Sequence, residues 1–186
     1  MSIFIPNNST PGPPPPPVLP MAWLSQPAKR LYWTLQAPLS TAITVMPLDL
    51  NPDTLREAYF RQTLAGTTWH PVSESPISEP PVASVEEGLD EADEPEGEPP
   101  EFGPLVVTAS NGQYVMVHDY VIAVHPWLME QKVQILKARN VVEDDDYEPA
   151  GNERLLLQLD RPAMISAEDE DEWKESLRWR FRNGGT

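Results

Sequence analysis

Two of the three histidines in the chain lie in the segment QYVMVHDYVIAVHPWLM, and an aspartate directly follows the first of them. His118, Asp119 and His125 are residue types that bind metal ions or relay protons, and a spacing of seven lets both imidazoles share one helical face. A metal site or a general base would need another converging ligand, and only His70 remains. Asp119 also suits a helix N-terminus, where a carboxylate caps the first turn. We therefore expect capping and packing; the alternative is a small enzyme or metal-binding domain that uses these three residues.

The element that must position these residues is a helix. Val117, Val121, Val124 and Leu128 recur at spacings of four, three and four, which is one face of a helix that begins near His118. Pro126 interrupts the pattern, because proline removes a backbone donor and clashes with the preceding turn. We expect either a kink there or a second helix that begins at Pro126 and continues towards residue 140.

Five segments have the composition and patterning of β-strands. Leucine and tryptophan alternate with polar residues over 31–36, and residues 41–46 and 155–160 are rich in β-branched residues or leucine. Residues 105–108 and 113–117 flank Asn111-Gly112, which is the strongest short signal for a hairpin turn. The two runs are predicted to pair with each other.

Two further segments are predicted to contain helical structure. In residues 51–66, Asn51 suits an N-cap, Pro52 the first helical position and Gly66 the position after the helix, with Leu55 and Tyr59 on one face. Residues 166–182 are ambiguous, because Trp173, Leu177 and Phe181 have helical spacing while LRWRFR alternates as a strand does. We favour a short acidic helical turn followed by a strand.

Some segments lack the apolar residues that a core requires. Residues 1–20 are rich in proline, and residues 72–104 combine Glu, Asp, Pro and Ser without any Lys or Arg. Residues 142–153 form a third, shorter acidic segment. The sequence therefore predicts a disordered tail at 1–20 and one α+β domain over 21–182, interrupted by a disordered acidic loop at 72–104. The domain should hold a small, mostly antiparallel sheet with two to four packed helices.

The overall composition excludes several classes of function. A formal net charge of −16 opposes binding to nucleic acid and to anionic membranes, which both require a basic surface. There are no cysteines, no apolar run long enough for a signal peptide or a membrane span, and no nucleotide-binding or hydrolase motif. We expect an intracellular protein, cytoplasmic or nuclear, with no cofactor.

The proline run is the most specific binding feature in the sequence. Five consecutive prolines favour an extended polyproline II helix, which aromatic grooves of SH3, WW, EVH1 and profilin-type modules recognise. The run consists of Pro13, Pro14, Pro15, Pro16 and Pro17. The alternative is a low-complexity tail that no partner recognises. Trp69 and Trp179 are further candidates for an interface, where aromatic residues are enriched.

The sequence resembles a domain of unknown function that is found in many fungal proteins. The opening of that domain, in which an apolar strand runs into a Pro-Ser/Thr-Ala bend and a second strand, is similar to the segment WLSQPAKRLYWTLQAPLSTAITV. LVVTASNGQYVMVHDYVIAVHPWL is similar to its later signature V-T-V-x-D-V-L-x-A-I-x-x-L. The positions that match are Val115, Val117, Asp119, Val121, Ala123, Val124 and Leu128. Met116 stands where the family usually has Thr, Tyr120 where it has Val, and the C-terminal third departs from the pattern. The resemblance covers about residues 23–128 and implies an α+β fold without a known activity.

These observations together favour a protein that acts through contacts with other proteins. We expect a non-enzymatic protein–protein interaction domain that docks partners on a sheet edge or a helix groove, with Pro13–Pro17 as a separate contact for a polyproline-binding module.

Overall fold

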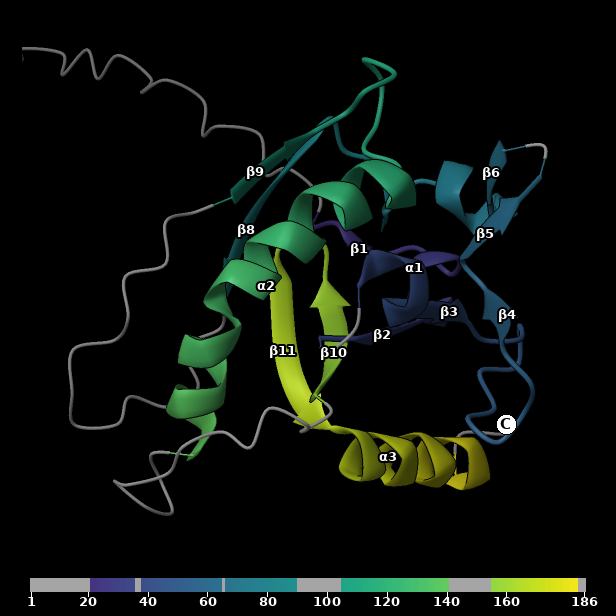
Figure 1. Cartoon of the computed structure of the whole chain (residues 1–186), viewed down its shortest axis with the longest axis vertical. Coiled ribbons are helices and arrows are strands. Elements are labelled where there is room, and N and C mark those ends of the chain that lie inside the picture. Colours follow the sequence, from purple (N-terminus) through teal and green to yellow (C-terminus); the bar gives the residue numbers. More distant parts are fainter. Residues whose placement is uncertain (1–20, 36–37, 65, 90–104, 141–154, 184–186) are drawn as a thin grey trace, which may run out of the picture.

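The computed structural model describes residues 21–35, 38–64, 66–89, 105–140 and 155–183 (Figure 1). It has an α+β fold, which confirms the predicted fold class. The helical elements are η1 (Ala28–Arg30), α1 (Leu39–Ala42), η2 (Pro71–Glu74), α2 (Val117–Asn140) and α3 (Glu170–Asn183), where η marks a 3-10 helix. The strands are β1 (Trp23–Leu24), β2 (Leu31–Thr34), β3 (Ile43–Val45), β4 (Glu57–Ala58), β5 (Phe60–Thr63), β6 (Gly66–Trp69), β7 (Ser78–Glu79), β8 (Ser84–Leu89), β9 (Leu105–Thr108), β10 (Leu155–Arg161) and β11 (Met164–Asp169).

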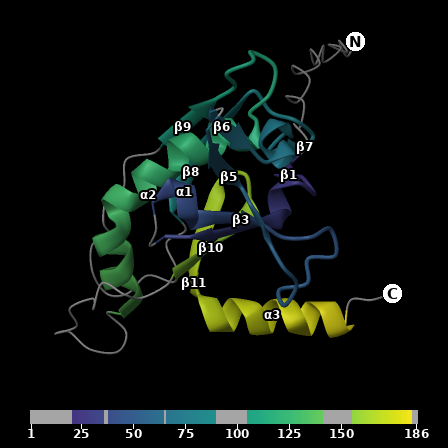
Figure 2. The same ribbon diagram turned by 45° about the vertical axis from the view of Figure 1, so that its right-hand side comes forward.

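A mixed sheet forms the centre of the fold. Within the described residues it has seven strands in the order β4-β3-β2-β10-β11-β8-β9. Neighbouring strands are antiparallel except β11 and β8, which are parallel. β1 pairs with β7 and β5 pairs with β6, each as a separate antiparallel ribbon. Figures 1 and 2 both show α3 below the strands, away from the N-terminal half of α2.

The two faces of the sheet bury different side chains because successive residues of a strand point to opposite sides. Leu31 and Trp33 of β2, with Leu155 and Leu157 of β10, pack in the larger core together with α2. The intervening Tyr32 and Leu156 pack with Met46 and with Trp173 of α3. We call the first group the α2-side core and the second the α3-side core. The predicted strands at 31–36 and 155–160 are thus confirmed as β2 and β10.

The second predicted strand, at 41–46, is shorter than expected. β3 covers only Ile43–Val45, and the preceding residues form the single turn α1. The amide groups of Thr41 and Ala42 donate to the carbonyl oxygen of Pro38 at 2.8 and 2.9 Å, which closes this turn. Pro38 therefore begins a helical turn before the β-branched residues can extend.

The helix predicted at 51–66 is wrong. Residues 57–58 instead form β4, and residues 60–63 and 66–69 form the hairpin of β5 and β6. The side chain of Asn51 accepts a hydrogen bond from the amide of Asp53 in a local turn, and Gly66 begins β6 with a φ of 127°, paired with Thr63. Only Tyr59 of the expected apolar face is buried, while Leu55 is exposed. The helical spacing of residues 51–64 is a local pattern and gives no information about pairing with residues 66–69. In the folded protein, that pairing outweighs the helical spacing.

The acidic segment expected to be disordered over 72–104 contains ordered structure in its first part. η2, β7 and β8 lie there, and β8 pairs with both β9 and β11 in the sheet. Val72, Ile77 and Val85 supply the buried side chains that fix these elements. The prediction of disorder depended on the overall composition of the segment, in which acids and prolines dominate. Composition alone does not show that a few well-spaced apolar residues are enough to fix these elements. Residues 90–104, the tail 1–20 and the acidic segment 142–153 lie outside the described residues.

The hairpin predicted between residues 105–108 and 113–117 is also wrong in its pairing. β9 forms as expected, but its partner is β8 rather than residues 113–117. The turn at Asn111-Gly112 is present: Gly112 has a φ of 69°, and the side chain of Asn111 accepts hydrogen bonds from the amides of Gln113 and Tyr114. The chain then runs beside residues 75–82 and enters α2.

α2 begins at Val117, close to the predicted start, and continues through Pro126 as one helix. Because α2 is continuous, the alternative of a second helix that begins at Pro126 is wrong. The helix changes direction along its length in Figure 1, in agreement with the alternative of a kink. The predicted inner face is confirmed, because Val117, Val121, Val124 and Leu128 are all fully buried.

The C-terminal residues form β11 and α3, so the strand favoured for residues 177–182 is wrong. Trp173 is buried against the α3-side core and Leu177 packs beside it, four residues on. Acidic residues fill the first turn of α3, and Glu170 pairs with Lys174 at 2.6 Å. Helical spacing of the apolar residues therefore outweighs their alternation.

Two neighbouring residues on α2, Leu128 and Met129, provide a direct test of which face of the helix is buried. Leu128→Ala should lower the free energy of unfolding by about 2–5 kcal/mol, because it leaves a cavity in the α2-side core. Met129→Ala should cost less than about 1 kcal/mol, since Met129 lies on the outer side of the helix. Urea unfolding monitored by circular dichroism measures both. Equal losses would contradict the described rotation of α2.

Candidate functional site

The three residues singled out for chemistry lie on α2 but have separate partners. Asp119 is almost completely buried, and its Oδ2 accepts hydrogen bonds from the amides of Met116 at 3.0 Å and Ser110 at 3.3 Å. Met116 directly precedes the helix, so this carboxylate satisfies a backbone donor that the helix leaves unpaired. The predicted capping role of Asp119 is confirmed.

His125 is buried one turn before the middle of α2. Its Nδ1 accepts a hydrogen bond from Nε1 of Trp33 at 3.1 Å, and the two rings stack with centroids 6.0 Å apart. The edge of Tyr120 meets the same indole ring. His125 thus belongs to the packing between α2 and β2, as the sequence predicted.

His118 lies at the start of α2 and packs against the indole of Trp69, with the ring centroids 4.4 Å apart. Its Nδ1 is buried, and no hydrogen-bond partner for it is found in the described part of the chain. The described residues also hold no group of three His, Cys, Asp or Glu side chains that could bind a metal ion. The structure therefore does not assemble His118, Asp119 and His125 into a metal site.

An aromatic cluster that the sequence did not predict surrounds His118. Trp69 lies at the centre, with Tyr59 and Phe60 edge-on to it at 5.6 and 4.9 Å. The Tyr59 hydroxyl is buried without a hydrogen-bond partner among the described residues. Burial raises the pKa of Tyr59, and the charge of Asp119 raises it further. Such a phenol stays protonated, so it cannot supply a tyrosinate base or nucleophile.

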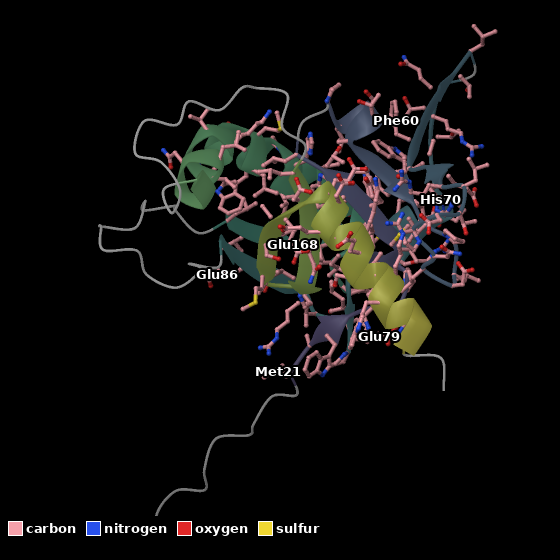
Figure 3. All side chains as sticks on the ribbon, turned by 90° about the horizontal axis from the view of Figure 1, so that it is seen from below. Met21, Phe60, His70, Glu79, Glu86 and Glu168 are labelled. Carbon is pink, nitrogen blue, oxygen red and sulfur yellow. The ribbon has the colours of Figure 1, made fainter. Side chains whose placement is uncertain are left out.

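His70 directly follows Trp69 at the end of β6. Its Nδ1 accepts a hydrogen bond from the amide of Val72 at 3.1 Å, and its Nε2 lies 3.6 Å from Oε2 of Glu57. Burial lowers the pKa of His70, the charge of Glu57 opposes that shift, and Arg30 and Arg61 add to it. Figure 3 shows His70 and Phe60 on one side of α3 and Glu86 on the other.

A second apolar face on α2 is the least expected surface feature. Ile122, Met129 and Val133 are 45%, 37% and 56% exposed, and Pro126 between them is exposed as well. We call these four residues the outer stripe. Their spacing of four, three and four repeats that of the buried inner face. The sequence contains this signal, but Pro126 within it predicts a kink or the start of a second helix rather than a continuous second face.

The remaining candidates are only partly described. Trp69 is half-buried in the aromatic cluster, whereas Trp179 on α3 is 67% exposed. Pro13–Pro17 lie outside the described residues. No helix within the described ranges has the length and apolar character to cross a membrane.

Comparison with known proteins gives no relative. No family model, no curated protein and no solved structure matches the chain. The resemblance to the fungal domain therefore stays a prediction.

The surroundings of His70 predict a pH dependence of stability. An unfolded histidine titrates near 6.5, whereas the folded protein disfavours the charged form of His70. The free energy of unfolding should therefore fall as the pH drops through about 6.5, and level off below the lowered folded-state pKa.

The comparison of wild type with His70→Gln isolates this effect from the other two histidines. The wild type should lose more stability than the variant between pH 8 and pH 5, measured by urea unfolding. A difference between the two proteins that does not change with pH would contradict the lowered pKa.

Proposed function

We propose that this chain is a non-enzymatic, intracellular protein–protein interaction domain that binds a partner through α2. The observation that carries the proposal is the outer stripe. The helix is already fixed to the sheet by its inner face, so a second apolar stripe is not needed for folding. Exposed apolar side chains that line up on one element are typical of surfaces that bind other proteins.

The free energy gained by burying the outer stripe limits the affinity that it can provide alone. Burying a whole side chain of this size contributes about 1.5–3 kcal/mol. Three side chains that are about half exposed would contribute roughly 2–4 kcal/mol when covered. Micromolar affinity requires about 8 kcal/mol. The outer stripe is therefore one part of a larger contact.

The edge of the sheet next to α2 offers a second part of that contact. The amide of Ala109 donates to the carbonyl of Ala83 at 3.0 Å, which makes them a hydrogen-bonded pair. Because such pairs alternate along antiparallel strands, the backbone groups of Val106 and Thr108 point away from β8. β9 packs against α2 and is the last strand of the described sheet. An extended partner segment can add to this edge.

Charge indicates the chemistry of the partner. Residues 90–104 hold seven acids and no base, and residues 141–154 hold six acids and one arginine. Together these segments carry −12 of the net −16, which leaves −4 for the rest of the chain. The first segment ends where β9 begins, and the second begins where α2 ends. A partner with an apolar ridge bordered by Lys and Arg is therefore favoured, whereas a second copy of this chain would be repelled.

Pro13–Pro17 are proposed as a separate contact for a polyproline-binding module. The proline rings fix φ before binding, so little conformational entropy is lost when a module binds them. Two modest contacts on one chain raise the overall affinity, because binding at one site holds the other partner surface nearby.

Two dye-labelled helical peptides test the α2 proposal by fluorescence anisotropy. Both carry the same leucine stripe, but one has Lys and Arg beside the stripe and the other has Glu. The full chain should bind the basic peptide, and Met129→Ser/Val133→Ser should weaken that binding at least tenfold because it removes apolar contact without changing charge.

Leu55→Ser/Leu64→Ser is the matched control, since both leucines are exposed on other elements and should not affect binding. Equal affinity for wild type and the Met129→Ser/Val133→Ser variant would contradict the proposal, because the acidic segments alone would then bind the peptide. A dimer in sedimentation that the same two serines dissociate would mean that a second copy occupies the outer stripe.

Substitution of all five prolines from Pro13 to Pro17 by alanine tests the second contact. Purified profilin and purified SH3, WW and EVH1 domains serve as probes. At least one should bind the wild type and lose tenfold or more on the variant, with no change in unfolding free energy. Failure of every probe to bind, or a loss of several kcal/mol in stability, would contradict this proposal.

A further inference from the structure

A cavity of about 200 Å³ lies between the η1 segment, β10 and α3. Most of its lining residues are apolar, among them Leu24, Leu31, Leu157 and Leu159 with Trp173 and Leu177 of α3, while nearly half of the lining surface is polar. Leu159 and Leu177 are only partly buried, so the cavity exposes apolar surface to water. It does not include the outer stripe, so binding in this cavity would be independent of the proposed function.

The wall that α3 contributes is fixed by contacts outside the cavity. The Tyr32 hydroxyl donates to Oε1 of Glu170, which also pairs with Lys174 at 2.6 Å. Burial raises the pKa of Tyr32 to about 12, so this hydroxyl stays a donor at neutral pH. Arg178 makes a two-point contact to Asp53 at 2.6 and 3.1 Å. The cavity is thus formed before any ligand enters.

Lys29 is the only charged side chain among the described residues that line the cavity. It is exposed, and no ion pair to its ammonium group is found in the described part of the chain. The adjacent Arg30 is already engaged, because its Nε donates to the carbonyl of Met46 at 2.7 Å. Gln158, the other polar lining residue, has a partner of its own. Lys29 is therefore a cation available at a cavity that is lined mostly by apolar residues.

We propose that this cavity binds a small aliphatic carboxylate, whose chain lies against Trp173 and the leucines and whose carboxylate pairs with Lys29. The cavity is smaller than the roughly 300–1,000 Å³ of sites for drug-sized ligands, which favours a short to medium chain. The charge on Lys29 selects an acid over an alcohol or an amine of the same length. The protein as a whole is strongly acidic, so nonspecific attraction would favour the amine instead.

Calorimetric titration of the full chain with octanoate, octan-1-ol and octylammonium tests the proposal. Octanoate should bind saturably and more tightly than the other two. Affinity should rise about fourfold for each added methylene from hexanoate to octanoate. It should stop rising once the chain exceeds the cavity. Trp173 fluorescence should change on binding, and Trp173→Phe should remove that change.

Three variants assign the binding to this cavity. Lys29→Met keeps the aliphatic stem, so it should weaken octanoate about tenfold or more and leave octan-1-ol unchanged. Leu159→Phe fills the cavity and should weaken both ligands. Leu64→Phe places the same change on an exposed turn and should affect neither. Unfolding curves of each variant confirm that it is folded.

Absence of saturable octanoate binding to the full chain overturns the proposal, and so does octylammonium binding more tightly than octanoate. Octanoate binding that survives both Lys29→Met and Leu159→Phe would place the acid elsewhere and overturn it as well.

Discussion

The hydrogen bond between Trp33 and His125 is the contact on which the rest of the arrangement depends. Trp33 lies at the centre of the sheet and is fully buried, so its indole N–H must find an acceptor inside the protein. His125 provides that acceptor from α2, across 92 residues of sequence. This bond and the stacking of the two rings act together with the buried inner face of α2 to fix the position and the rotation of the helix on the sheet. That rotation decides which residues of the helix are buried and which form the outer stripe.

The opposite face of the sheet is held differently. Only Tyr32, Met46, Leu156 and Trp173 form the buried group there among the described residues. Polar contacts to Glu170 and Asp53 supplement that small group and attach α3. Trp173 and Leu177 line the cavity next to Lys29 from this side, while Leu31 and Leu157 line it from the α2-side core. The cavity therefore lies where the two cores meet, apart from the outer stripe.

The sequence predicted those elements whose apolar pattern is carried by their own residues. The inner face of α2, the strands β2 and β10, and the capping by Asp119 all follow from local spacing. The errors at 51–66, 113–117 and 177–182 arose where pairing or packing with distant residues decided between two local patterns. β5 pairs with residues 66–69, and β9 pairs with β8, which contributes a buried valine. Trp173 of α3 packs against the ring of Tyr32.

The candidate site shows the same limit. Local spacing was enough to expect that His118 and His125 pack rather than bind a metal. It could not name Trp33 and Trp69 as their ring partners, because no pattern in one segment specifies contacts with another. The aromatic cluster around Trp69 was missed for that reason. The outer stripe was a different error, since its spacing was present in the sequence and only the proline within it obscured the second face.

The central claim is that α2 buries one apolar face and leaves the other free. Because the chain contains no cysteine, single-cysteine variants along α2 report side-chain access without background. The decisive measurement is the rate of thiol labelling at positions 121, 122, 124, 128, 129 and 133 in the native protein. We expect fast labelling at 122, 129 and 133, and slow labelling at 121, 124 and 128. Slow labelling at 122, 129 and 133 in the monomer would show that the outer stripe is already covered, and would contradict the account.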